Sequence, residues 1–392
     1  MKKVVVFFII SILIISGFFI LYHNLGVRFD EQKSKNELTQ DSPSQPLKYS
    51  NSQDSSTQND KNCPVVLTEY LVDPRQVQKV GQVGVVHGSG KSIVERSYIS
   101  IKPEFYEQKI LLYAPTDMTL ISGAHYNNPS AGQNTMPDYV LKFDAGCGVE
   151  ILLGHMKGVI PEIAAKLTPL KQDSREDEIR PGIEFKAGDK IGYYFQENKE
   201  GAVAGFDFIV RDSSVTNQFI NQERYSDDRA RNLIHGVCPY DYYTPEKKQD
   251  YYNLFGGSGG KLFEVKDCGA SSRDKKGTIS GMWFLDKEIV GEIYDNYKDG
   301  EYGSPISLVG DEEAVTFGNI GQSPTLKVYA NEPTYKLPIQ VTTEHCYNFG
   351  TNSRGSGFAY FKVINDETMD VYYSSSGNCP STIPQNPKRY YK

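Results

Sequence analysis

The chain has 392 residues, of which 23% are charged and 39% hydrophobic, and its formal net charge is −7. Its lysines and arginines are spread along the sequence and form no basic cluster, which excludes a nucleic-acid-binding protein. Residues 63–392 are numerous enough for two domains with hydrophobic cores.

The N-terminus predicts a membrane anchor. Lys2 and Lys3 precede an uncharged apolar run over residues 4–22, and about 19 residues rising about 1.5 Å each nearly span a hydrocarbon core. The run has no small-x-small exit, so we expect an uncleaved signal anchor over residues 1–28, with a cleaved signal peptide as the alternative. Both lysines precede the span, which predicts a membrane-anchored protein with a cytoplasmic N-terminus and an extracytoplasmic bulk.

Two features follow from this location. Residues 29–62 are rich in Ser, Gln, Asn and Asp and offer little to bury, so they are expected to form a disordered tether. The six cysteines are an even number outside the membrane, which favours disulfides over the alternative of six buried thiols. Cys346 with Cys379 is the favoured pair, because a strand-turn-strand stretch separates them, and Cys238 with Cys268 comes second.

Residues 63–225 are predicted to be one β domain. Short apolar or alternating runs are separated by Gly, Pro and Asn clusters, and one helix is expected over 160–167 from the spacing of its apolar residues. The predicted strands cover residues 83–86, 97–101, 110–113, 139–143, 149–153, 190–194 and 206–210.

Residues 226–276 are predicted to be a linker segment with a short helix over 247–254. Its glycine-rich stretch at 256–260 is predicted to be a flexible joint. Residues 277–392 are expected to form an all-β domain, either a small antiparallel barrel or a sandwich. Its predicted strands cover residues 288–294, 306–309, 314–317, 325–329, 339–342, 357–363 and 369–373.

Two sets of motifs resemble known families. Gly281-Met282-Trp283 resembles the opening motif of lipocalin-like barrels, in which the tryptophan plugs one end. Tyr113-Ala114-Pro115, Gly154-His155-Met156, Ala187-Gly188-Asp189 and Phe206-Asp207-Phe208 follow one another in this order. In that order they resemble the lysostaphin-type zinc endopeptidases that cut peptidoglycan cross-bridges. The resemblance covers residues 80–215 and implies a β domain with one zinc ion, held by two histidines and an aspartate.

Most of that family's ligands have no counterpart here. Gly205-Phe206-Asp207 stands where the family has His-x-His, and residues 96–102 contain neither the histidine nor the aspartate of the first ligand pair. Only Gly154-His155 matches. We therefore expect a mainly β pseudoenzyme: a non-catalytic, envelope-associated binding or regulatory protein without a cofactor. Its partner would be an envelope glycan, a peptide or another protein.

Three residues are candidates for the groove. His155, Asp207 and His87 could form a rearranged ligand set, which makes a zinc-dependent cell-envelope hydrolase the alternative. Otherwise His155 is a strand-end histidine bonded to nearby backbone. Asp207 lies within an apolar strand and needs a partner, because an unpaired buried carboxylate is costly. Arg96, Arg211 or His155 could be that partner. A structural spacer is a third interpretation.

Overall fold

The structure is a computed structural model. It describes residues 63–392 apart from 87–91, 128–137, 168–170, 173–180, 198–204, 226–230, 258, 289–301, 322–324 and 351–355. The predicted anchor (1–28) and tether (29–62) lie outside the described residues. Within the described ranges no helix has the length and apolar composition needed to cross a membrane. The described residues all belong to one compact unit.

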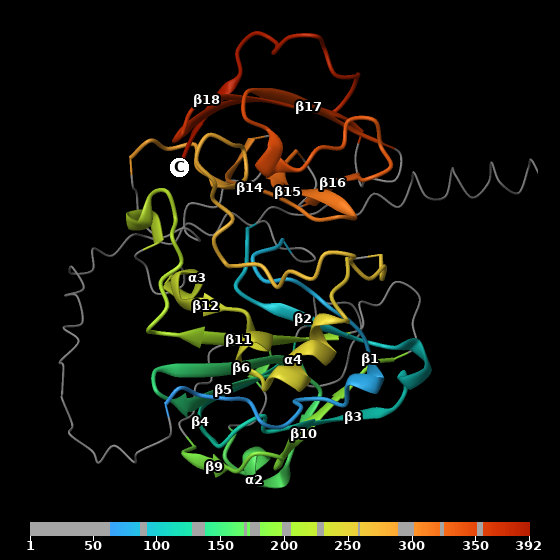
Figure 1. The fold of residues 1–392 in the computed structure, drawn as a ribbon, viewed down its shortest axis with the longest axis vertical. Helices are drawn as coiled ribbons and strands as arrows, with labels where there is room; N and C mark the ends of the chain where they lie inside the picture. The colour runs from blue at the N-terminus through green and yellow to red at the C-terminus, as the bar shows by residue number, and fades with distance from the viewer. Residues whose placement is uncertain are drawn as a thin grey trace, which may run out of the picture. The chain divides into compact units, whose positions relative to one another are not determined.

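The first half of this unit is built on a nine-stranded sheet (Figure 1). Its strands are β1 (Val77–Val80), β2 (Ser97–Ile101), β4 (Met118–Asn127), β5 (Asp138–Gly146), β6 (Val149–Met156), β8 (Lys171–Gln172), β9 (Ile183–Phe185), β11 (Gly205–Asp212) and β12 (Gly236–Val237). The strand order is β1-β2-β11-β6-β5-β4-β8, with β12 paired to β11 and β9 paired to β4. Among the described pairs in this sheet only β4 with β8 is parallel.

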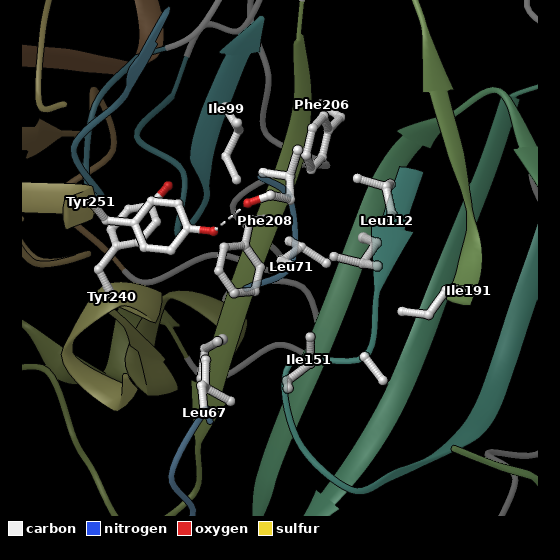
Figure 2. Packing of buried hydrophobic residues seen from close by; sticks show 14 of the residues in the cluster. Leu67, Leu71, Ile99, Leu112, Ile151, Ile191, Phe206, Phe208, Tyr240 and Tyr251 are labelled. Carbon is white, nitrogen blue, oxygen red and sulfur yellow. Dashed lines mark hydrogen bonds between the residues drawn. The ribbon is translucent and has the colours of Figure 1, made fainter. Parts of the chain in front are cut away.

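One face of the large sheet carries the core. Successive side chains of a strand point to opposite faces, so Phe206 and Phe208 of β11 enter the core while Asp207 points away. A three-stranded sheet of β3 (Lys109–Tyr113), β10 (Lys190–Phe195) and β7 (Gly158–Val159) contributes Leu112 and Ile191 to the same core (Figure 2). We call the face that carries Asp207 the outer face of the large sheet.

Short helices extend this core. The 3-10 helix η5 (Pro239–Tyr242) brings Tyr240 against Phe208, and α4 (Pro245–Tyr252) brings Tyr251 against Tyr240 (Figure 2). Tyr240 lies 5.9 Å from Phe208 between ring centroids, and the two tyrosine rings lie 4.8 Å apart. The other helices are η1 (Pro74–Gln76), η2 (Pro103–Phe105), α2 (Pro161–Ala164), η4 (Gln222–Tyr225), α3 (Arg231–His235) and η6 (Pro338–Gln340).

The second half has two four-stranded antiparallel sheets. The first contains β13 (Gly281–Trp283), β14 (Tyr302–Gly310), β15 (Ala314–Ile320) and β16 (Thr325–Tyr329); the second contains β17 (Glu344–Phe349), β18 (Gly357–Asn365), β19 (Thr368–Ser374) and β20 (Lys388–Tyr391). Side chains of both sheets share one core cluster that includes Trp283 and Phe317. Phe284 forms an isolated bridge with Tyr391, which links the beginning of this region to its last strand. The prediction of a mainly β protein with antiparallel sheets is confirmed.

Two predicted strands are wrong. Residues 83–86 contribute only a single bridge between Val85 and Val94, because Val83 donates its N–H to Cys268 and Gly84 adopts a φ of 74°. Residues 339–342 overlap η6, and the next strand begins at Glu344. The ten-residue strand β4 was not predicted, since its sequence alternates weakly and contains Gly123. Most of 288–294 lies outside the described residues.

Three disulfides join described residues. Cys238–Cys268 and Cys346–Cys379 are the two predicted pairs, and both are confirmed. The third bond joins Cys63 to Cys147 and closes a sequence separation of 84 residues. It ties the first described residue to the β5–β6 turn.

Candidate functional site

Asp207 lies on the outer face of the large sheet, beside a glycine of the neighbouring strand. Its register partner on β6 is Gly154, and its partner on β2 is Tyr98. A Cβ atom added to Gly154 would lie 2.8 Å from Asp207 Oδ2. Glycine at position 154 therefore leaves the space that the Asp207 carboxylate fills.

His155 lies between two carboxylates. Its Nδ1 is 3.0 Å from Asp138 Oδ2 at the start of β5, and its Nε2 is 3.6 Å from Asp207 Oδ2. Its φ is 62°, in the left-handed region that few residues other than glycine adopt. Such backbone conformations are concentrated at functional sites and cost about 1–3 kcal/mol. The fold thus holds the backbone of His155 in an unusual conformation and places its imidazole between two carboxylates.

Two cations complete the cluster. Arg96, just before β2, places Nη1 2.6 Å from Asp207 Oδ2, and Lys157 Nζ lies 3.6 Å from Asp138 Oδ2. Both carboxylates are buried, whereas the side chains of Arg96 and His155 are 34% and 38% exposed. The solvent-facing groups of the cluster are therefore a guanidinium and an imidazole, and the acids lie behind them.

The pKa values of the central pair are both raised. Burial raises the pKa of Asp207, although Arg96 and His155 oppose this. The hydrogen bond with Asp138 raises the pKa of His155. The raised pKa of His155 means that its protonated ring stabilises the folded state. This contribution to the free energy of unfolding is complete below the usual pKa of 6.5 and is lost as the pH rises through the pKa of His155 in the folded protein. For Asp207, stability falls as the pH rises from 3.8 through its raised pKa, because the folded state disfavours the charged carboxylate.

Asp138→Asn is expected to lower the pKa of His155 by about 1, because the ring loses its charged hydrogen-bond partner. Nuclear magnetic resonance titration of the His155 ring protons, assigned with His155→Gln, measures this shift. Asp370→Asn is the control, because Asp370 pairs with the exposed Arg389. An unchanged His155 titration in Asp138→Asn would show that this hydrogen bond does not set the pKa.

A second row of ion pairs crosses the same strands. Lys142 of β5 lies 2.6 Å from Glu150 of β6, and Arg211 of β11 lies 2.9 Å from Glu95 and 3.9 Å from Glu150. Charges of opposite sign alternate along this row. The described residues of the outer face therefore show no excess of basic groups of the kind that binds polyanions.

The structure brings together two of the three predicted groove residues. His155 and Asp207 face each other, while His87 lies outside the described residues. Arg96 and His155 are both partners of Asp207, whereas Arg211 pairs with Glu95. Asp138 was not predicted, because it is 17 residues from His155 and meets it only through the pairing of β5 with β6. An aspartate at the first position of a strand that otherwise includes Val140, Leu141 and Phe143 was the available signal.

The described donors do not fit the three-ligand zinc site of the resembled family. His155 and Asp207 are two facing donors, but the described residues contain no group of three His, Cys, Asp or Glu side chains able to hold a metal. The Arg96 guanidinium already binds the Asp207 oxygen that would face the ion. At Gly205, where the motif comparison predicts a histidine of the resembled family, a Cβ would lie 2.3 Å from the Ile99 carbonyl oxygen. Position 205 therefore has no room for a side chain.

An open cavity of about 490 Å³ is present on the described surface. It is lined by Glu69, Tyr70, Asp73, Pro74, Arg75, Tyr113 and Gly188. None of the cluster residues around His155 lines it.

Comparison with family models, with curated proteins and with solved structures finds no match for this chain. The resemblance to lysostaphin-type peptidases stays a prediction from the sequence motifs.

Proposed function

We propose that this protein is a non-catalytic, envelope-associated binding or regulatory protein. It would be built on a degenerate lysostaphin-like domain and anchored by residues 1–28. The observation that carries the proposal is that Arg96 and His155 share one oxygen of Asp207, at 2.6 and 3.6 Å. The permanently charged Arg96 guanidinium thereby occupies the Asp207 oxygen that would have to bind a metal ion placed next to His155.

Electrostatics and space both support the non-catalytic interpretation. A guanidinium is always charged at physiological pH, so it would repel a divalent ion placed between His155 and Asp207. The close contact of Gly205 with β2 excludes a further ligand at that position. The remaining Asp138–His155 pair orients the imidazole and needs no metal for its stability.

The exposed groups support a binding role. Arg96 and His155 are partly exposed and are fixed by buried carboxylates, so they lose little conformational entropy when a ligand binds. A guanidinium group donates hydrogen bonds to carbonyl and carboxylate oxygens, whereas both ring nitrogens of His155 already face Asp138 and Asp207. An envelope peptide or glycan offers such acceptors. The C-terminal region, opened by Gly281-Met282-Trp283, would be a barrel of the lipocalin-like type in the same proposal.

Zinc content separates this proposal from the hydrolase alternative. The full chain, loaded with zinc and then dialysed, is expected to retain far less than one zinc per chain by elemental analysis. Wild type, His155→Ala and Asp207→Ala should not differ, because the described residues supply only two facing donors. Near-stoichiometric zinc that both substitutions abolish would establish the zinc-dependent hydrolase instead.

Binding is tested with insoluble peptidoglycan. The full chain is expected to sediment with it and to release no soluble fragments, and Arg96→Ala is expected to weaken retention. Arg389→Ala is the matched control, an exposed arginine paired with Asp370 on the C-terminal region. Release of fragments by wild type would contradict the non-catalytic proposal, and equal retention of both variants would exclude the outer face as the binding surface.

A further inference from the structure

The turn between β14 and β15 binds backbone N–H groups of a distant segment. Glu312 accepts hydrogen bonds from Glu264 N at 2.9 Å and Val265 N at 2.7 Å, and Glu313 accepts one from Gly259 N at 2.7 Å. Each carboxylate–amide bond is charge-assisted and therefore stronger than a neutral hydrogen bond. The two glutamates thus connect the C-terminal sheets to the segment that follows α4.

The glycine-rich stretch is shaped around Glu313. A Cβ at Gly257 would lie 1.7 Å from Glu313 Oε2, and one at Gly259 would lie 2.0 Å from Oε1. Lys79 donates to the Gly257 carbonyl oxygen. The sequence predicted a flexible joint here, but the described glycines make room for a carboxylate. Because these glycines have no side chains, the Glu313 carboxylate can approach their backbone closely, in addition to the backbone freedom that glycine provides.

A second, buried contact joins the same two regions. Lys392 Nζ lies 2.6 Å from Asp274 Oδ1, and both side chains are almost fully buried. Arg224 Nε donates to the Lys392 carbonyl oxygen at 2.8 Å. Met282, Phe284 and Val309 of the C-terminal region pack in one cluster with Val86, Ile93, Phe219, Tyr225 and Leu233.

We propose that Glu312 and Glu313 form a releasable latch, and that the buried contact around Asp274 and Lys392 is the pivot that stays closed when the latch opens. The two contacts differ in how easily they open. Partly exposed hydrogen bonds can exchange with water, whereas opening the pivot would expose an apolar cluster and a buried ion pair. The inference concerns movement of the C-terminal region and does not depend on the proposed ligand.

Acidification is one way to release the latch. The hydrogen bonds from Glu264 N and Val265 N lower the pKa of Glu312. Its contribution is therefore present above the usual glutamate value of 4.5 and is lost as the pH falls through the lowered pKa. The charged groups that act on Glu312 are Lys261 and Lys266. Lys79, which donates to the Gly257 carbonyl oxygen, is itself surrounded by the charges of Glu313, Asp311 and Lys327.

Amide hydrogen exchange on the full chain at constant pH tests the latch. In Glu312→Gln the amides of Glu264, Val265 and Gly259 are expected to exchange about tenfold faster together. The Gly259 amide binds the unchanged Glu313, so its faster exchange reports that the two glutamates act as one unit. Phe284 N, bonded to Tyr391 O beside the pivot, should keep its rate.

Two further variants keep the test decisive. Gly259→Ala, which crowds Glu313, is expected to reproduce the faster exchange. Glu367→Gln is the matched control, an exposed glutamate in the turn between β18 and β19, away from the two glutamates of the latch. Faster exchange confined to Glu264 and Val265, or unchanged exchange everywhere, would overturn the latch. Loss of protection at Phe284 as well would overturn the pivot.

Discussion

Lys392→Met is expected to lower the free energy of unfolding by about 3–5 kcal/mol, because it leaves a buried carboxylate without its cation. Lys392 Nζ lies 2.6 Å from Asp274 Oδ1, and the two side chains are 1% and 3% exposed. The same ammonium donates to Ser280 O and lies 4.4 Å from the centroid of Trp283. In the variant, Asp274 would keep only its hydrogen bonds with backbone and no ion pair.

Urea unfolding of the full chain, followed by tryptophan fluorescence, measures this loss, since Trp283 is the only tryptophan and lies against Lys392. Arg389→Met is the matched control: its partner Asp370 lies at 2.6 Å, but Arg389 is 48% exposed, so less than about 1 kcal/mol is expected. The double variant Asp274→Asn with Lys392→Met should recover much of the loss. Equal effects of Lys392→Met and Arg389→Met would refute the buried-pair argument.

Removing the Cys63–Cys147 bond with paired alanine substitutions is expected to cost about 4–5 kcal/mol in the chain-entropy model. The bond closes a separation of 84 residues, and the Cys346–Cys379 bond closes one of 33. A longer closed loop restricts the unfolded chain more, so the second pair should cost less, about 3.5–4 kcal/mol.

Urea unfolding of the two paired-alanine variants, without reductant, tests whether the Cys63–Cys147 variant loses more stability than the Cys346–Cys379 variant. A larger loss for the Cys346–Cys379 variant would mean that native-state packing around each bond outweighs loop length. A loss below about 1 kcal/mol for the Cys63–Cys147 variant would mean that its loop is already constrained in the unfolded chain.

Local patterns predicted the central strands of the large sheet. The apolar run around Phe206 and Phe208 gave most of β11, and the run that includes Ile151 gave most of β6. The pattern failed where the backbone N–H groups of a segment bind a loop instead of a neighbouring strand. Val83 is an example, because its N–H donates to the Cys268 carbonyl oxygen. Periodicity reports burial of side chains and carries no information on the partner of each N–H.

The candidate site was predictable only in part. Gly154-His155 and the carboxylate at Asp207 stand out as polar or small residues at strand positions, and a buried aspartate requires a partner. Among the partners considered, only the fold distinguishes Arg96 from Arg211. Asp138 is found only when β5 is paired to β6 in its observed register.

The mainly β character and two favoured disulfide pairings were predictable before the fold was known, because alternation and cysteine spacing are local properties. The surroundings of His155 and the carboxylate held by the glycine-rich stretch follow only from the three-dimensional arrangement of the chain. Asp138, Asp207 and Arg96 come from three different parts of the sequence, and Glu313 lies 54 residues from Gly259. Such contacts depend on strand order and register, which place distant charges within a few ångströms and which no local pattern encodes.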